Sequence, residues 1–483
     1  MFPNALKVPG DDGLHGILDA DGSFTIVGTH LKHEILPGKP ATTLAYTVEY
    51  GGRTFVNPVL RVATGSNLRV RYWNALDETS IVHWHGLKVD TNNDGHPHYA
   101  VSAGETYDYQ FTVTNRAGTY WYHPHPHHLA AKQAYLGLAG FLLVEDPEDI
   151  AVQRALDLTL GETDIPLLIQ DKRFNEDGSF AYSAGGQEHF RGHLGDTMLV
   201  NLTPAPCFDC ESRVYRFRLV NGSNARIYRL AFLREREPLE FTLIGADGGL
   251  LEAPLTVREV LLAPSERADV LLDLRAAPVG ERVVLSSLPF DAMTFGEVAE
   301  HGTHSDGIPA NGAPLDIMLI RVAAPTRYDL LVPQRLSNVR RSCGSSTGGT
   351  FVLDQAKGLW RINRATYRMT ETAFSVQRGA REVWEFRNPA PGMPHPIHVH
   401  GFQYRVLERR NSPPHVKRLA IDARGVLATE SGWKDSVLLW PDETIRLAMD
   451  FSHPHHGDQV YMLQCHNLEH ETHGMMLNFR VIS

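Results

Sequence analysis

One pattern recurs three times along the chain and constrains its fold more than any other feature. Each copy begins with a strand in which apolar and charged residues alternate and which ends in asparagine, at Asn74, Asn221 and Asn388. A turn and a strand of a second type follow in each copy, and the turns contain Glu105, Glu266 and Glu443. Two marks that recur in the same order indicate copies of one unit. Because the alternation has a period of two and Gly, Pro and Asn separate the runs, the unit is predicted to be a β-sandwich.

The length agrees with three such units in one all-β protein. A chain of 483 residues divides into about three domains of ordinary size, each able to bury its own core. We predict domains over residues 1–146, 147–324 and 325–483. The Gly- and Ser-rich residues 342–350 are predicted to form a mobile loop at the start of the third domain.

Composition excludes several classes of protein. No apolar run approaches the roughly 18 residues of a membrane helix, so no membrane span is expected. A net charge of −10 and a pI near 6.2 argue against a nucleic-acid partner, which would call for a basic surface. The first residues lack a basic stretch followed by an apolar run, so we expect a signal peptide to be absent or already removed.

A short segment near the end of the chain combines three kinds of metal ligand. In QCHNLEHETHGM, Cys465 is followed by His470 and Met475. Thiolate, imidazole and a weak axial thioether are the ligands of blue type 1 copper, which needs one further histidine. The sequence HPIHVH, residues 395–400, offers it.

Two histidine pairs lie far upstream, in HWHG at residues 83–86 and in WYHPH at residues 121–125. In an extended strand residues i and i+2 point to one face, so each pair directs two imidazoles at one point. Together with the later motifs they indicate a centre that holds more than one ion. Dinuclear zinc or iron hydrolases also use such pairs, but those sites have no use for Cys465 and Met475. The isolated histidines are predicted to be ordinary hydrogen-bonded residues: His96, His98, His128, His453, His455, His456 and His473.

In these motifs the chain resembles the multicopper oxidases, a laccase-like family that includes bacterial laccases, bilirubin oxidases and copper efflux oxidases. The family motifs H-x-H-G, H-x-H, H-P-x-H-x-H and H-C-H-x3-H-x4-M occur in this order between His83 and Met475. One position departs from them, because Gln464 stands where the family has the first histidine of H-C-H. The resemblance implies three consecutive cupredoxin-like Greek-key sandwich domains and up to four copper ions.

The resemblance also assigns the copper ligands. Type 1 copper is expected to take His395, Cys465, His470 and Met475. Type 2 copper would take His83 and His398. One type 3 copper would take His85, His123 and His466, and the other His125, His400 and whatever Gln464 provides. Since neighbouring residues of a strand alternate, Cys465 should point one way and Gln464 and His466 the other, toward the cluster.

Only the first and third units carry these ligands, so the cluster is expected at their interface, with the middle unit as a spacer. Two carboxylates match the family positions that deliver protons, Asp94 and Glu471. Reduction of O2 to water in a closed site requires such a relay. The alternative for Asp94, in TNNDG, is a solvated turn residue, and for Glu471 a surface charge.

Gln464 leaves three explanations open: a natural variant with reduced activity, an engineered or trapped form, or a blue protein that no longer reduces oxygen. An amide oxygen is a weaker ligand for copper than imidazole, so we expect that type 3 ion to be held less tightly. Because the other ligands are intact, some oxidase activity is expected. The alternative function is a copper-binding or electron-transfer protein.

Phenols and aromatic amines are the expected electron donors, since transfer through an exposed edge of His470 would tolerate many shapes. A bilirubin-type donor fits as well, whereas a dedicated cuprous oxidase fits less well, because the chain has 10 Met and no Met-rich insert. The protein is expected to act as a monomer.

The other cysteines are predicted to be structural. Cys207 and Cys210 have C-x-x-C spacing in a β-rich context, so we expect a local disulfide or a bridge from one of them to Cys343, with free thiols as the alternative. An oxidised pair would favour an extracytoplasmic location.

Overall fold

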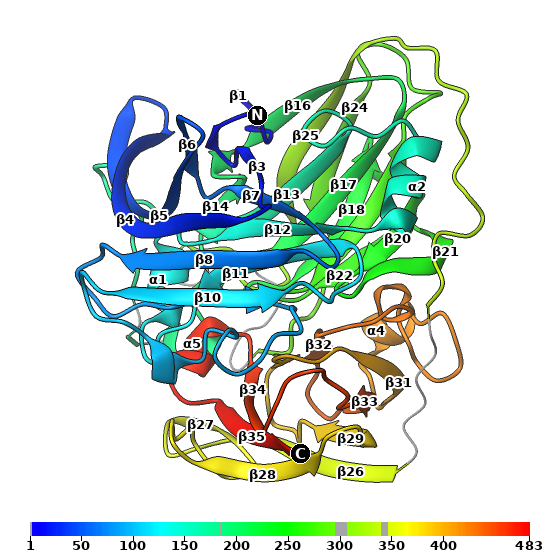
Figure 1. Ribbon diagram of the computed structural model, residues 1–483. Coiled ribbons are helices and arrows are strands. Elements are labelled where there is room, and N and C mark those ends of the chain that lie inside the picture. Colours follow the sequence, from blue (N-terminus) through cyan, green and yellow to red (C-terminus); the bar gives the residue numbers. More distant parts are fainter. Residues whose placement is uncertain (1, 184, 187, 295–306, 340–345) are drawn as a thin grey trace.

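The computed structural model describes residues 2–183, 185–186, 188–294, 307–339 and 346–483. Over these residues the chain forms six β-sheets and a few short helices (Figure 1). The prediction of an all-β, cupredoxin-like protein is confirmed. None of the described helices is long and apolar enough to cross a membrane.

The first part of the chain forms two facing sheets within the described residues. Trp84, Tyr109 and Tyr122 meet between them, with ring centroids of Trp84 and Tyr109 5.3 Å apart. The strands of one sheet are, in spatial order, β10 (Thr106–Thr112), β8 (Asn67–Asn74), β4 (Ser23–Leu36), β5 (Lys39–Tyr50), β6 (Arg53–Val56) and β2 (Gly13–Leu14). Those of the other are β3 (Ile17–Asp19), β7 (Val59–Ala63), β12 (Gly140–Glu145), β11 (Gly118–Pro124) and β9 (Val82–His85).

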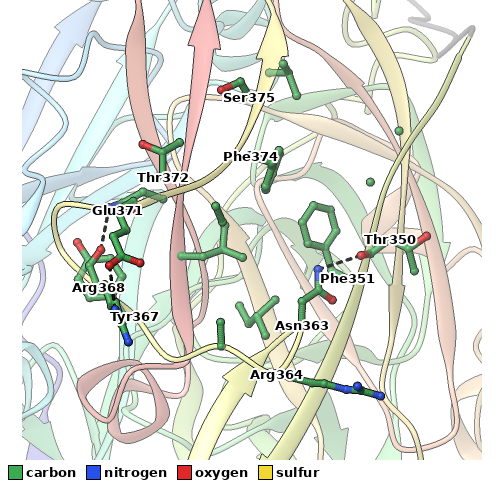
Figure 2. A pocket seen from close by; sticks show the side chains of 18 of the residues that line it. Thr350, Phe351, Asn363, Arg364, Tyr367, Arg368, Glu371, Thr372, Phe374 and Ser375 are labelled. Carbon is green, nitrogen blue, oxygen red and sulfur yellow. Dashed lines mark hydrogen bonds and ion pairs between the residues drawn. The ribbon is translucent and has the colours of Figure 1, made fainter.

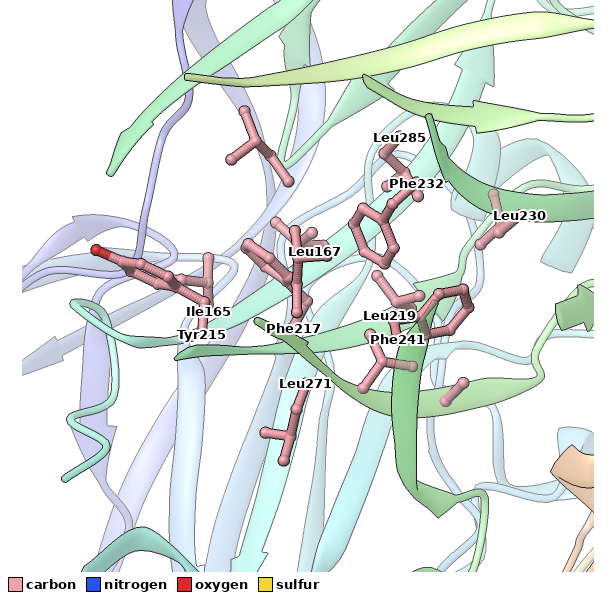
Figure 3. Packing of buried hydrophobic residues seen from close by; sticks show 14 of the residues in the cluster. Ile165, Leu167, Tyr215, Phe217, Leu219, Leu230, Phe232, Phe241, Leu271 and Leu285 are labelled. Atoms are coloured by element: carbon pink, nitrogen blue, oxygen red, sulfur yellow. The ribbon is translucent and has the colours of Figure 1, made fainter. Parts of the chain in front are cut away.

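The middle part has an aliphatic and aromatic core between its sheets (Figure 3). Leu167 and Phe217 of one sheet pack against Phe232 and Leu285 of the other, and all four are buried. One sheet contains β15 (Thr203–Pro204), β14 (Thr197–Val200), β13 (Asp164–Lys172), β17 (Val214–Asn221), β23 (Arg267–Asp273), β20 (Phe241–Ala246) and β21 (Gly249–Val257). The other contains β1 (Asn4–Ala5), β16 (Pro206–Glu211), β25 (Leu315–Ala324), β24 (Arg282–Ser287), β18 (Tyr228–Arg234), β19 (Glu237–Pro238) and, paired with β18, β22 (Val260–Leu262).

The last part repeats the arrangement with an aromatic core, in which Phe351 stacks on Phe386 and Phe374 on Phe479. One sheet contains β27 (Leu359–Ile362), β26 (Ser346–Ala356), β29 (Arg381–Arg387), β33 (Thr444–Asp450) and β31 (Tyr404–Arg410). The other contains β28 (Thr372–Gln377), β35 (Met476–Ile482), β34 (Gln459–Cys465), β30 (His395–Val399) and β32 (Ser436–Leu439).

Short helices connect these strands. Asp146 caps α2 by accepting hydrogen bonds from the backbone N–H groups of Glu148 and Asp149, so the first predicted domain boundary falls at the start of a helix. The second falls at the end of β25, and the extents of the domains stay a prediction. The helices are η1 (Pro97–Tyr99), α1 (Ala130–Tyr135), α2 (Pro147–Ala155), α3 (Glu188–Arg191), α4 (Pro414–Lys417), η3 (Ala428–Glu430) and α5 (Leu468–Thr472).

The repeated Asn and Glu of the sequence occupy equivalent places in all three parts. β8 pairs with β10, β17 with β23 and β29 with β33, each antiparallel. In every pair the N–H of the strand-ending asparagine donates to the carbonyl of the turn glutamate, at 2.9, 3.1 and 3.1 Å. The asparagine amide also donates to carbonyls of the following loop and of a neighbouring segment. The sequence repeat therefore encodes one strand-and-turn junction, used three times.

Two sequence predictions are wrong in part. The predicted mobile loop covers residues 342–350, of which 342–345 lie outside the described residues, while Ser346 begins β26. Gly348 packs so closely that an added Cβ would lie 2.5 Å from Trp384 Cδ1. The glycines there serve close packing of a strand and not a loop.

The predicted local disulfide does not form: among the described residues, Cys207 and Cys210 are free thiols. Both lie in the extended strand β16, where residues three apart point to opposite faces and are separated by about 10 Å, too far for a disulfide. A bridge to Cys343 lies outside the described residues. Without the local disulfide, only the predicted bridge to Cys343 would support an extracytoplasmic location.

Candidate metal centre

Cys465, His395 and His470 form a compact triangle of ligand atoms. The Sγ of Cys465 lies 3.4 Å from Nδ1 of His395 and 3.6 Å from Nδ1 of His470, and the two nitrogens are 3.2 Å apart. Cys465 ends β34 and His395 begins β30, which pairs with β34. These separations suit three atoms that share one ion, since ligands about 2 Å from a metal lie some 3–3.5 Å from one another.

The short helix α5 brings His470 to this triangle. The side chain of Asn467 accepts a hydrogen bond from the backbone N–H of His470 and so starts the helix. Met475 follows the helix: its N–H donates to the carbonyl of His470 at 2.9 Å, and its carbonyl accepts from Cys465 N–H at 3.0 Å. Cys465 and Met475 lie in the same buried hydrophobic cluster.

The surroundings of the triangle are dry and aromatic. The ring of Trp360, from β27, lies 4.2 Å from that of His470 and 5.2 Å from that of His395. Burial lowers the pKa of His395 to about 3 and raises the pKa of the Cys465 thiol. The imidazole is thus neutral, the form that binds metal, and a cation would be required to stabilise the thiolate.

His470 is not exposed, contrary to the sequence prediction. Its side chain is 0% exposed, and its Nε2 donates to the carbonyl of Phe190 at 2.8 Å. Phe190 belongs to α3, which covers this edge of the ring, and its own side chain is 39% exposed. A segment of the middle part therefore separates His470 from solvent. Because this segment has no ligand motif, the sequence did not predict the contact.

The remaining histidines form a second cluster between the first and last parts of the chain. Ligand nitrogens from distant segments meet there: His85 Nδ1 lies 3.3 Å from His123 Nε2, which lies 3.4 Å from His466 Nε2. The rings of His83 and His400 are 4.0 Å apart and those of His85 and His398 3.8 Å apart. Among the described residues, the groups able to hold an ion include His83–His398–His400 and His83–His85–His123. All seven histidines predicted for this cluster are buried: His83, His85, His123, His125, His398, His400 and His466.

Outer hydrogen bonds fix the direction of these rings. Nδ1 of His83 donates to the backbone carbonyl of Asp94, and Nδ1 of His398 donates to that of Asp435 at 2.8 Å. Their Nε2 atoms, and that of His400, are buried and have no hydrogen-bond partner among the described residues. Burial holds the pKa of His83 and of His398 well below its usual value, so these rings are neutral. These rings thus present buried, neutral nitrogens toward one another while the second nitrogen of each ring is held by a hydrogen bond. A metal site requires this arrangement.

Gln464 faces this cluster. Its Oε1 accepts from His125 Nε2 at 3.0 Å, and its Nε2 donates to Glu471 Oε2 at 3.2 Å. As the alternation of the strand predicts, Gln464 and His466 lie on the cluster side while Cys465 lies with His395 and His470. The amide oxygen therefore lies beside Nε2 of His125, a predicted ligand, where the family motif has an imidazole.

Asp94 and Glu471 are buried beside the histidines. Asp94 is 0% exposed and its Oδ2 accepts from His400 Nδ1 at 2.8 Å, so it is not a solvated turn residue. Glu471 is 1% exposed, with Oε1 3.4 Å from His125 Nε2, so it is not a surface charge. Burial, with a contribution from Glu469, raises the pKa of Glu471 well above its usual value. A protonated carboxyl in this position can donate a proton toward the cluster.

Sequence reasoning missed Asp435 and Ser436. Asp435 Oδ1 lies 3.2 Å from His85 Nε2, and Ser436 Oγ lies within 3.3 Å of both His85 and His398. The sequence offers one sign of their role: the charged pair Lys434–Asp435 directly precedes the apolar strand β32, and both residues are buried. A buried charge is costly unless it is paired.

A cavity of about 1030 Å³ is lined by residues of β26, β28 and the segment between them (Figure 2). Phe351 and Phe374 point into it, and Asn363 and the pair Arg368–Glu371 lie at its rim. The described residues that line it include no predicted metal ligand. We therefore assign this cavity no role in the metal centre.

Comparison with known proteins gives a consistent result. Residues 39–149 and 344–483 match family models described as multicopper oxidase. The chain is 30% identical over 466 residues to the multicopper oxidase mco of Staphylococcus haemolyticus, covering 95% of this chain and 88% of that one. It is 29% identical to a laccase of Bacillus subtilis, covering 93% and 91%. The crystal structure of the multicopper oxidase McoA of Aquifex aeolicus superposes with a TM-score of 0.88 at 38% identity and covers 99% of each chain.

Proposed function

Because this chain belongs to the multicopper oxidase family, we propose that it is a laccase-like enzyme that couples one-electron oxidation of small donors to reduction of O2 to water. The observation that carries the proposal is the end of β34. Cys465 lies with His395 and His470, while its neighbour His466 lies 3.4 Å from His123 in the histidine cluster. A single peptide bond thus joins the two sites.

The proposed ligands follow the family motifs. His395, Cys465, His470 and Met475 would hold type 1 copper, and the second cluster would hold one type 2 and two type 3 ions. The buried, unpaired nitrogens of His83, His398 and His400 support this assignment. Bound copper would supply one-electron redox chemistry at Cys465 and oxygen reduction at the histidines. Up to four ions are proposed, with the weakest beside Gln464.

The chain supplies protons and excludes water. Reduction of O2 by four electrons consumes four protons, which must enter a buried site through ionisable groups. Asp94 and Glu471 are proposed to deliver them, since their oxygens lie 2.8 Å from His400 Nδ1 and 3.4 Å from His125 Nε2. Trp360 and the surrounding core keep water from the thiolate, so electron transfer there requires little rearrangement of solvent.

Phenols and aromatic amines are the proposed donors. Since Phe190 covers His470, a donor would dock over α3 and pass its electron across the hydrogen bond between the Phe190 carbonyl and His470 Nε2. An electron can cross one such layer without direct contact, so the proposal keeps a broad donor range. A monomeric state and an extracytoplasmic location are part of the proposal as predictions.

A second candidate is a copper electron-transfer protein that reduces oxygen poorly. The observation that favours it is Gln464, whose oxygen takes the place of an imidazole and hydrogen-bonds His125. In that case type 1 copper would be reduced by donors, but electrons would not continue to O2.

Oxygen consumption with a phenolic donor separates the candidates. The copper-loaded protein should bleach its blue band under nitrogen and recover it on admission of air, with about one O2 consumed per four donor electrons. Copper-free protein is the control. Bleaching without oxygen uptake would favour the electron-transfer protein, and a loaded protein with no blue band would refute both.

A further inference from the structure

The middle part of the chain contributes an arginine next to the histidine cluster. Arg267, at the start of β23, is fully buried and directs both terminal nitrogens at Asp435. Nη1 lies 2.6 Å from Oδ1 and Nη2 2.6 Å from Oδ2, a two-pronged pair that fixes the plane of the carboxylate. The predicted role of this part as a spacer does not account for such a contact.

Asp435 in turn contacts two predicted ligands through different atoms. Its Oδ1 lies 3.2 Å from Nε2 of His85, and its backbone carbonyl accepts from Nδ1 of His398 at 2.8 Å. Each contact occupies one ring nitrogen and leaves the other for the cluster. His85 is thereby made to present Nδ1 and His398 Nε2, opposite nitrogens of the ring.

The arginine itself is held from several sides. Its Nε donates to the carbonyl of Thr119 at 2.9 Å, and its Nη2 to that of Asp247 at 3.0 Å. The ion pair also lies against Gly86, directly after His85, where an added Cβ would be 2.6 Å from Asp435 Oδ2 and 2.9 Å from Arg267 Nη2. The glycine of HWHG thus makes room for the pair. Arg267 therefore has one position, set by segments from all three parts.

We propose that Arg267 is a positioning residue for the histidine cluster, acting through the Asp435 carboxylate to fix which nitrogen His85 presents to copper. The inference rests on the proposed function. A fork that holds both carboxylate oxygens cannot be replaced by lysine, whose ammonium offers one point of contact. Loss of such outer contacts weakens metal binding typically by about 10–100-fold.

The test is Arg267→Lys, compared with Arg226→Lys as a matched control. Arg226 is also a buried arginine of the middle part, and its Nε lies 2.7 Å from Asp171 Oδ2. Asp171 contacts none of the predicted ligands among the described hydrogen bonds. Both changes should lower the midpoint of urea unfolding. Only Arg267→Lys should weaken copper binding at the histidine cluster by about 10–100-fold, seen in copper titration of the purified protein.

Type 1 copper is an internal reference in each molecule. With Arg267→Lys, the blue absorption and its anaerobic bleaching by a phenol should be unchanged. Unaltered affinity of the histidine cluster for copper would overturn the inference, as would equal loss of type 1 copper and cluster copper or equal effects of the two substitutions. If Arg267→Lys does not fold, Asp435→Ala, which removes the carboxylate beside His85 and keeps the backbone carbonyl beside His398, takes the same test with the same outcomes. Absence of type 2 copper from the unaltered protein would instead refute the proposed function.

Discussion

The two candidate sites are built in different ways, although a single peptide bond joins them. The ligands of the Cys465 site come from residues 395–475 and lie in the core of one sandwich, against Trp360 and other apolar side chains. The histidine cluster takes ligands from residues 83–125 and 398–466 and is surrounded by buried polar groups, among them Asp94 and Asp435.

The two sites therefore hold their predicted ligands in place by different means. At the Cys465 site, burial in an apolar core keeps the ligands close and dry, and few hydrogen bonds orient them. At the histidine cluster several rings have an outer hydrogen-bond partner, and His85, His398 and His400 have theirs in distant segments. The first site should thus tolerate changes at the interface between parts of the chain, whereas the second should not.

Cys465→Ser is expected to give the largest difference between the two sites. A serine hydroxyl cannot supply the thiolate-to-copper charge transfer that gives a type 1 site its colour, so the blue band should vanish completely. The type 2 signal should persist, because His83 and His398 are untouched. Visible absorption and electron paramagnetic resonance of the copper-loaded variant measure both; a variant that stays blue would refute the assignment of type 1 copper.

Asp94→Asn should affect only the histidine cluster. An asparagine oxygen can still accept from His400 Nδ1, so the shape is preserved while a titrating group is lost. We expect aerobic turnover to fall about 10²-fold, the usual effect of losing a general acid, while anaerobic bleaching of the blue band keeps its rate. Stopped-flow bleaching and oxygen uptake make the comparison. If bleaching slowed as much as turnover, Asp94 would be acting on the Cys465 site or on the fold.

Gln464→His should raise the copper content. The unaltered protein is expected to hold fewer than four ions, with the deficit beside His125 and His400, because an amide oxygen binds copper more weakly than imidazole. The variant should be fuller and turn over faster, while its blue band changes little. Metal analysis and O2 consumption on both proteins test this, and equal occupancy with equal turnover would show that the glutamine is an adequate substitute.

Sequence alone predicted most of this comparison. The alternation of strands predicted that Cys465 and its neighbours face opposite ways, and H-x-H spacing predicted the convergence of His83 with His85. Both inferences rest on the geometry of a single strand, which is nearly independent of the rest of the fold. The asparagine repeat predicted the three sandwiches for the same reason.

Contacts across the fold could not be predicted in this way. The cover of Phe190 over His470 and the link from Arg267 to Asp435 join residues 280 and 168 positions apart. Neither segment carries a ligand motif, and a buried charge looks like any other charge in a sequence. C-x-x-C spacing suits a local disulfide only where the chain turns between the two cysteines, and in the extended strand β16 it does not turn.

The smallest effect is expected from the asparagine repeat, and it tests whether the Cys465 site depends on its sandwich. The amide of Asn388 donates to the carbonyl of Met393 at 2.8 Å, two residues before His395. That of Asn221 donates to the carbonyl of Arg226 at 2.8 Å, in a segment that contains no predicted ligand. Substitution of either residue by alanine leaves buried carbonyls unpaired and should cost about 1–3 kcal/mol in the free energy of unfolding. Only Asn388→Ala should also alter the blue absorption, because it frees the loop that carries His395. Urea unfolding and visible spectra of the two variants decide the matter: an unchanged spectrum in Asn388→Ala, at equal loss of stability, would mean that the packing around Trp360 alone holds the site.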